Sequence, residues 1–202
     1  KGGNYLLNVG PTASGEIPPE SVERLKAMGD WMAVNSSSIY GTTASPFVRL
    51  KWGRATKKEY SNATDLFLHV FEWPEDGRLP VDGLRNEVSG AYFLADYQLP
   101  IEVRKSATGI VLHLPDHALD PISTVIVLKV KGALDVERIL PTQTAEGAIA
   151  LTVDDANIHN PGYGGRLKIG QDSNLAPLLE SWTDFRSHVD WVIAIARPGR
   201  FE

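Results

Sequence analysis

The sequence of 202 residues contains no cysteine. This absence excludes disulfide bonds, thiolate metal sites and a cysteine nucleophile within these residues. Basic residues are not in excess, since 20 Lys and Arg stand against 25 Asp and Glu and the net charge is −5. A nucleic-acid binder would carry a basic surface instead. No apolar run approaches the ~20 residues that a transmembrane helix needs. We therefore expect neither nucleic acid nor a membrane as a partner.

The composition is that of a globular protein with many turns. Hydrophobic residues make up 43% and charged residues 22% of the chain, which excludes an intrinsically disordered protein. The 18 glycines and 13 prolines favour short β-strands joined by turns. The length allows one or two domains.

Residues 1–45 have the pattern of one β/α unit. Residues 4–9 contain a short continuous apolar run, which is typical of a strand buried on both faces of a parallel sheet. Pro19 and Glu20 predict the first turn of a helix. One apolar stripe follows at helical spacing, formed by Val22, Leu25, Met28 and Met32. A strand, a loop and an amphipathic helix together are typical of a parallel-sheet domain.

Both ends of the sequence suggest that further chain is missing. A strand buried on both faces needs neighbours, and nothing precedes residues 4–9 to supply one. A turn is predicted at 197–200, with almost no chain left for a returning strand. We therefore expect the chain to be a fragment.

Residues 46–134 change to the period of two that is typical of strands. Residues 48–52 alternate apolar with basic side chains and predict a half-buried strand, whereas 65–73 are apolar on both faces and predict a central strand. Further strands are expected near 89–95, 109–114 and 123–131. Short strands at this spacing predict an antiparallel β-sandwich. Residues 135–202 are also β-like, and we expect a linker followed by an incomplete β-sandwich or jelly roll.

No residue is assigned a catalytic role from the pattern. Asp154 and Asp155 are adjacent, so in a strand they would point to opposite faces. His113 and His117 are four residues apart, but Pro115 lies between them and the region reads as strand and turn. Neither a nucleophile elbow nor a phosphate-binding loop is present.

The five tryptophans are the other candidates for a binding function, because sugars stack on exposed indole rings. Trp52, Trp73 and Trp191 lie inside strand patterns and are expected in the core. Trp182 lies outside a clear pattern, so core packing and sugar binding both remain open for it.

Several motifs resemble one enzyme family. Residues 2–12 (GGNYLLNVGPT), 15–18 (GEIP), 23–25 (ERL) and 39–42 (IYGT) resemble the end of the catalytic barrel of the α-L-fucosidases of glycoside hydrolase family 29. The motifs WGRAT, LHVFEWP and DPISTVIVL within 46–134 resemble the C-terminal β-sandwich of that family. The motifs SWTD, DWV and PGRFE are similar, more weakly, to an accessory carbohydrate-binding-like jelly roll of some bacterial members.

The resemblance implies a mainly β fragment, with antiparallel β-sandwiches preceded by the last β/α unit of a truncated (β/α)8 barrel. It implies a secreted or periplasmic parent enzyme that hydrolyses terminal α-L-fucose from glycans with retention and without a cofactor. The family's Asp nucleophile and its acid lie upstream, so the fragment alone is expected to be inactive. Asn8, Val9 and Gly10 are expected near the pocket, as residues that shape it.

Two alternatives remain. A non-catalytic carbohydrate-binding protein would use Trp182 or Tyr163, with a structural calcium ion at Asp154 or Asp155. A purely structural role would involve self-association. In either case the stripe of Val22, Leu25, Met28 and Met32 is expected to pack on residues 46–134, on a second copy or on a partner chain.

Overall fold

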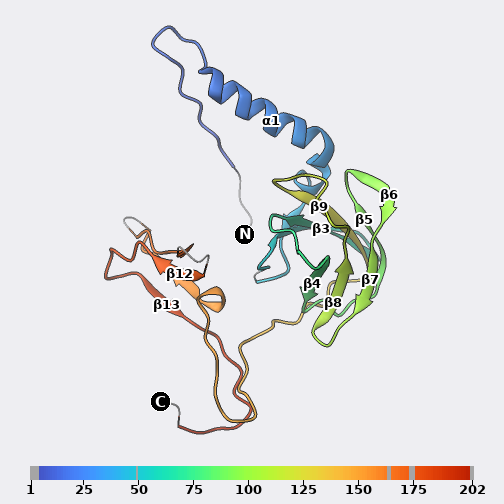
Figure 1. The fold of residues 1–202 in the computed structure, drawn as a ribbon, viewed down its shortest axis with the longest axis vertical. Helices are drawn as coiled ribbons and strands as arrows, with labels where there is room; N and C mark the ends of the chain where they lie inside the picture. Colours follow the sequence, from blue (N-terminus) through green and yellow to red (C-terminus); the bar gives the residue numbers. More distant parts are fainter. Residues whose placement is uncertain (1–4, 49, 163–164, 173–175, 201–202) are drawn as a thin grey trace. The chain divides into compact units, whose positions relative to one another are not determined.

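The computed structural model describes residues 5–48, 50–162, 165–172 and 176–200. It is mainly β, with antiparallel sheets and, among these residues, a single α-helix (Figure 1). The chain forms two compact units, Lys1–Arg138 and Ile139–Glu202. The expected division of the sequence at 1–45, 46–134 and 135–202 stays a prediction.

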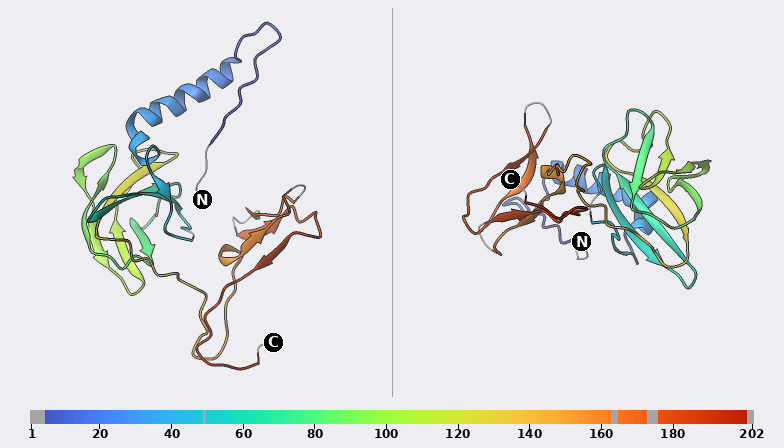
Figure 2. Two further views of the ribbon diagram at one scale, coloured as in Figure 1. Left: turned by 180° about the vertical axis from the view of Figure 1, so that it is seen from behind. Right: turned by 90° about the horizontal axis from the view of Figure 1, so that it is seen from below.

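The larger unit contains two antiparallel sheets that face each other (Figure 2). The first sheet has the order β1 (Thr43–Ala44), β2 (Gly53–Glu59), β3 (Ala63–Val70), β9 (Thr124–Lys131), β5 (Val88–Phe93) and β6 (Asp96–Pro100). The second has the order β4 (Arg78–Asp82), β8 (Gly109–His113) and β7 (Glu102–Lys105). The strands expected near 89–95, 109–114 and 123–131 are thereby confirmed as β5, β8 and β9.

The central strand β3 is buried on both faces, as its apolar sequence predicts. It pairs with β2 on one side and with β9 on the other. Leu66 and Leu68 point into the core between the two sheets. Phe67 points to the opposite face, where it packs with Val127 and the ring of Trp31. The period of two thus sends alternate side chains into two separate apolar clusters.

Helix α1 (Pro19–Asn35) is followed by the 3-10 turn η1 (Ser36–Ser38). The predicted helix is confirmed, and its C-terminal end is fixed to the sheet through Trp31. The side chains of Val22, Leu25 and Met28 are 50%, 39% and 44% exposed. The expectation that this part of the stripe packs on residues 46–134 is therefore wrong, and packing on a second copy or partner chain stays a prediction.

Residues 5–9 do not form the expected doubly buried strand. They have no assigned strand, and the side chains of Tyr5 and Leu6 are 76% and 92% exposed. A strand of a parallel sheet requires hydrogen-bonding neighbours, and no described strand of this chain pairs with this segment. The apolar run predicts that residues 5–9 are buried, but the described residues of this chain do not cover them.

Residues 48–52 also differ from the expected half-buried strand. Leu50 and Trp52 are buried as predicted, but Val48 is 69% exposed, and Leu50 forms an isolated bridge with Gly53. Arg49 lies outside the described residues. A Cβ atom on Gly53 would lie 1.9 Å from the carbonyl oxygen of His69. β2 thus begins at Gly53, five residues after the expected start, at a close approach of two backbones that only glycine allows.

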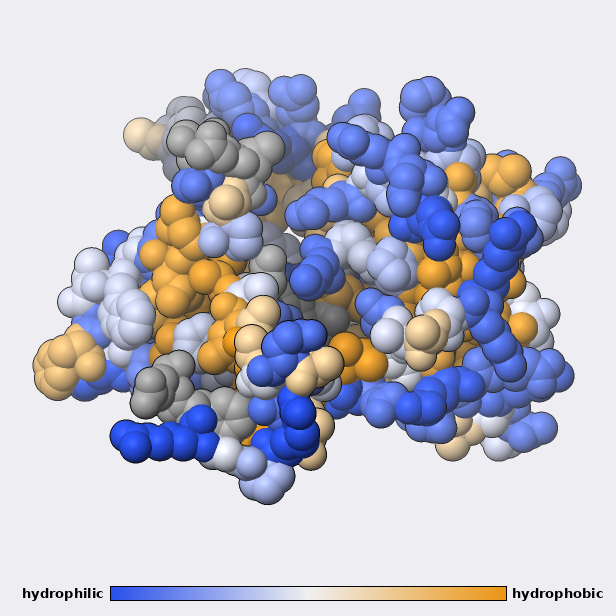
Figure 3. Space-filling model, turned by 60° about the horizontal axis from the view of Figure 1, so that its bottom comes forward, coloured by the Kyte–Doolittle hydropathy of each residue, from blue (hydrophilic) through white to orange (hydrophobic). Residues whose placement is uncertain are grey.

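The smaller unit consists of two two-stranded sheets and the 3-10 turn η2 (Val153–Asp155). β10 (Asn157–His159) pairs with β13 (His188–Asp190), and β11 (Lys168–Gln171) pairs with β12 (Pro177–Glu180). Among the described residues of this unit, only Leu167 and Ser187 are buried. Apolar side chains accordingly appear at its surface, at the left of Figure 3.

Candidate functional site

Asn8, Val9 and Gly10, which were expected to shape a pocket, lie in the segment before α1. Asn8 and Gly10 are exposed and Val9 is half-buried. No described atom lies within 4 Å of the place that a Cβ on Gly10 would occupy. The structure does not bring these residues together with other chemical groups, and their place beside a pocket stays a prediction.

All five tryptophans use the indole N–H in the same way, by donating it to a main-chain oxygen. Trp52 is buried in the core as predicted, Trp73 packs against that core, and Trp191 is half-buried. The five pairs join Trp31 to Ser123, Trp52 to Pro80, Trp73 to Pro115, Trp182 to Ser187 and Trp191 to Thr152, at 2.7–3.0 Å. Four of these bonds join segments distant in the sequence, whereas the bond from Trp182 to Ser187 closes the loop 181–187 on itself.

Trp182 lies on the segment 181–187 that joins β12 to β13, and its side chain is 51% exposed. Phe185, on the same segment, is 94% exposed. Two aromatic rings are thus presented to solvent on one short loop. Tyr163, the other candidate for sugar binding, lies outside the described residues.

The buried side chain of Ser187 fixes the end of the loop 181–187 to the rest of the smaller unit. Ser187 is 3% exposed and donates its hydroxyl to the side-chain oxygen of Asn160 at 2.9 Å. The Asn160 amide also donates to the carbonyl of Leu167 and accepts the N–H of Leu167. Because both buried residues of the unit meet Asn160, this side chain ties the loop to the interior.

Asp184 and Arg186 form a two-pronged ion pair within the same loop. The guanidinium donates from Nε and Nη2 to the two carboxylate oxygens at 3.0 and 2.7 Å. The backbone N–H of Arg186 adds a third bond at 2.9 Å. The hydrogen bonds from Arg186 lower the pKa of Asp184 to about 2. These bonds fix the carboxylate of Asp184, which lies between Trp182 and Phe185 in the sequence.

His69 is a buried titratable group of the larger unit. Its ring is tilted against Trp31 at 6.2 Å between centroids and lies 3.5 Å from the hydroxyl of Thr56. Thr56 in turn donates to the carbonyl of Ser38 at 2.6 Å. Burial lowers the pKa of His69, so the neutral imidazole is favoured. Through these contacts His69 joins the helix end to the sheet.

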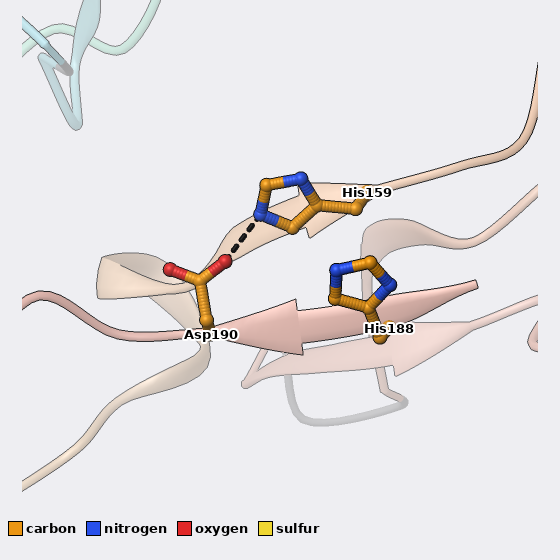
Figure 4. Close-up of side chains that lie close together, drawn as sticks. All are labelled: His159, His188 and Asp190. Atoms are coloured by element: carbon orange, nitrogen blue, oxygen red, sulfur yellow. Dashed lines mark hydrogen bonds and ion pairs between the residues drawn. The ribbon is translucent and has the colours of Figure 1, made fainter. Parts of the chain in front are cut away.

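Three exposed side chains of the smaller unit converge on one face of the β10–β13 ladder (Figure 4). His159 and His188 are directly opposite each other, and their rings stack at 4.6 Å with an angle of 7°. Asp190 lies two residues beyond His188, hence on the same face, and bonds to Nε2 of His159. One donor atom from each residue lies within 4.8 Å of the others.

Two neighbours orient this cluster of His159, His188 and Asp190. The amide of Asn157 donates to Oδ2 of Asp190 at 2.9 Å, which is the first cause of the lowered pKa of that carboxyl. Nδ1 of His188 lies 3.4 Å from the carbonyl oxygen of Arg186. These contacts engage Oδ2 of Asp190 and Nδ1 of His188, while Oδ1 of Asp190 bonds to His159.

Reasoning from the sequence missed this cluster, because it considered only the close pair His113 and His117. Within the described part of the chain those two histidines join no group of potential ligands. The available signal was the alternation of His188 with Asp190, which places both on one face of a strand. The partner strand that carries His159 is set by the fold. Asp155 accepts a hydrogen bond from Thr152, and the side chain of Asp154 lies outside the described part, so the calcium expectation stays a prediction.

Comparison with known proteins agrees with the motifs of the first segment. Residues 1–37 match the family model for alpha-L-fucosidase. The chain is similar in sequence to part of the α-L-fucosidases. The alpha-L-fucosidase of Branchiostoma floridae is 31% identical over 137 residues, which are 66% of this chain and 30% of that protein.

Two solved α-L-fucosidase structures resemble the fold. Isoenzyme 1 from Paenibacillus thiaminolyticus has a TM-score of 0.54 and 32% identity, over 62% of this chain and 30% of that one. The α-L-fucosidase from Vibrio sp. strain EJY3 has a TM-score of 0.58 and 26% identity, over 82% of this chain and 31% of that one. The matched part thus spans about a third of the length of each of these three α-L-fucosidases.

Proposed function

We propose that this chain is part of an α-L-fucosidase, a retaining glycoside hydrolase that releases terminal α-L-fucose from glycans. The observation that carries the proposal is the match of residues 1–37 to the family model, extended by 31% identity over 137 residues. In this proposal, residues 1–45 are the last strand and helix of a (β/α)8 barrel. The β-sandwich of the larger unit supports that barrel from one side.

The exposed apolar side chains of residues 5–35 support this assignment. In such a barrel each strand is buried between two others and an outer ring of helices covers them. Leu6 is 92% exposed, and Val22, Leu25 and Met28 on α1 are also exposed. These are the side chains that a complete barrel would cover. Asn8, Val9 and Gly10 would then lie at the C-terminal end of a barrel strand, where the active sites of this fold are built.

The chain alone is proposed to be inactive toward fucosides. Retaining hydrolysis requires two carboxyl groups about 5–5.5 Å apart on either side of the scissile bond. A closed barrel of the proposed kind requires eight strands, and residues 1–45 would supply one of them. The proposed partner is a fucosylated glycan, and the proposed location is secreted or periplasmic. Among the described residues, no helix is long and apolar enough to cross a membrane.

The test compares fucose release by the full-length natural gene product with that of this 202-residue chain, using 4-nitrophenyl α-L-fucopyranoside. The proposal expects hydrolysis by the first and none above background by the second. Inactivity of the full-length product toward this substrate and toward fucosylated oligosaccharides would overturn the proposal. Activity of the 202-residue chain alone would overturn the assignment of the catalytic groups to other barrel strands.

The loop 181–187 favours a second role. Its rings Trp182 and Phe185 are exposed to solvent, while Ser187 at its end is buried and hydrogen-bonded to Asn160. Exposed rings held on a rigid support suit the stacking of a sugar face. We propose this loop as a carbohydrate contact. Trp182→Ala should reduce binding of fucosylated oligosaccharides at least tenfold in calorimetry, whereas Ile195→Ala, an exposed apolar residue elsewhere in the unit, should not. Equal binding by the two variants would contradict this role.

A further inference from the structure

The smaller unit has few interior contacts to hold its strands together. Two of its described residues are buried, and each of its two sheets has two strands. An isolated pair of strands is marginally stable in water. Small units with such limited cores are commonly stabilised by a disulfide or a bound metal ion. The chain contains no cysteine, so a disulfide is excluded.

We infer that His159, His188 and Asp190 form a binding site for a divalent transition metal ion, of which zinc is the best fit, and that the ion fastens β10 to β13. Two imidazoles and one carboxylate are the donor set that zinc accepts, with water completing the coordination. Calcium and magnesium prefer sites built from oxygen atoms and are poorly matched to two imidazoles. This inference is independent of the proposed fucosidase function.

The geometry brings three donors together from two strands. His159 and His188 are paired directly across the ladder, and Asp190 is on the same face two residues further along β13. Their donor atoms lie within 4.8 Å of one another. Around a tetrahedral zinc ion, with ligands at about 2.0–2.2 Å, the donors are about 3.3–3.5 Å apart. All three side chains are exposed, so rotation about their side-chain bonds can close this difference.

The two neighbours of the cluster are those that a metal site uses to orient its ligands. A histidine ligand commonly donates its second ring N–H to a carbonyl, and a carboxylate ligand commonly accepts a further hydrogen bond. Nδ1 of His188 faces the carbonyl of Arg186, so a proton on Nδ1 leaves the lone pair on Nε2 for the metal. Asn157 holds Oδ2 of Asp190 and leaves Oδ1 directed at His159.

The bond that now joins Asp190 to His159 would be replaced when zinc binds. In the metal-bound form both groups would contact the ion instead of each other. The ion would then bridge β10 and β13 at their side chains, beside the three register pairs that the ladder forms. Because the unit is small, such a bridge would act mainly by stabilising the folded state.

The test is isothermal titration of the complete chain with Zn²⁺ alone, followed by titration of His188→Gln, His159→Gln and Asp190→Asn. We expect one ion per chain, at least tenfold weaker binding in each ligand variant, and about tenfold weaker binding in Asn157→Ala. His113→Gln and His117→Gln are matched controls and should bind as the unaltered chain does. Far-ultraviolet circular dichroism should show that each variant stays folded.

A second readout separates a specific site from loose binding by exposed histidines. In NMR spectra, the ring signals of His159 and His188 should change together at one equivalent of Zn²⁺, and those of His113 and His117 should not. Unchanged affinity in His188→Gln, the absence of binding, or equal binding of Ca²⁺ would each overturn the inference.

Discussion

The indole Nε1 of Trp31 donates a hydrogen bond of 2.9 Å to the main-chain oxygen of Ser123, 92 residues later in the chain. This bond joins the last turns of α1 to the loop that leads into β9. That loop is itself held by Asp120, whose carboxylate accepts the N–H groups of Ile122 and Ser123 at 2.8 Å. The contact is therefore made between two ordered elements.

The first prediction concerns this contact. Trp31→Phe keeps an aromatic ring beside Phe67 but removes the N–H, and should lower the free energy of unfolding by about 1 kcal/mol. Trp31→Ala also removes the packing and should cost about 3 kcal/mol. The measurement is urea unfolding followed by circular dichroism. Ser123→Ala is the control, because it keeps the accepting carbonyl; a larger loss in this variant than in Trp31→Phe would contradict the assignment.

The second prediction concerns Gly83, which follows β4. Its φ of +87° is in the left-handed region, and a Cβ atom there would lie 2.3 Å from the carbonyl oxygen of Glu137. Gly83→Ala should therefore destabilise the larger unit by about 2 kcal/mol or more. Gly29 within α1 is the matched control, because a Cβ atom there meets no neighbour within 4 Å. Gly29→Ala should not lower the unfolding temperature, since alanine favours a helix over glycine.

The third prediction concerns the ionisation of Asp184. Its pKa is lowered from 3.8 to about 2 by the hydrogen bonds from Arg186. Any stability from this pair is therefore fully present above pH 3.8 and is lost as the pH falls through about 2. Arg186→Gln should return the pKa toward 3.8, and Arg186→Lys should give an intermediate value. Carboxyl ¹³C titration measures each value, and a pKa of Asp184 near 3.8 in the unaltered chain would contradict the prediction.

The fourth prediction concerns His69. Burial lowers its pKa below 6.5, so the folded state binds this proton less readily than the unfolded state does. Stability should therefore be greatest above pH 6.5 and should decrease as the pH falls below that value. NMR titration should place the His69 midpoint below 6.5. A midpoint at or above 6.5 would show that the His69 ring is not desolvated in the folded state.

The local spacing of apolar residues predicted correctly those helices and strands that pack against other elements of this chain. A run that is apolar on both faces identified the central strand β3, and helical spacing identified α1. The same reasoning failed at residues 5–9, because an apolar run indicates that a segment is to be covered but does not identify what covers it. β2 begins only at Gly53, whose backbone lies close to that of His69, and no local pattern reveals this long-range approach.

The candidate metal ligands required knowledge of strand pairing. His159 and His188 are far apart in the sequence, and the alternation of His188 with Asp190 supplies only two of the three ligands. Only the antiparallel register of β10 with β13 places them opposite each other. By contrast, Trp182 was identified from sequence because a large ring outside any strand pattern has no evident place in a core. Trp182 is exposed, and sugar binding by its ring stays a prediction.

The central claim is that this chain is part of an α-L-fucosidase, and the intact mass of the natural gene product tests it most directly. The account predicts a mass well above that of the 202-residue chain, with room for a barrel of about 250 residues before the β-sandwich. The two catalytic carboxylates should then be found in that additional part. A natural product of about 202 residues would contradict the account, because one barrel strand and one helix cannot form the catalytic site.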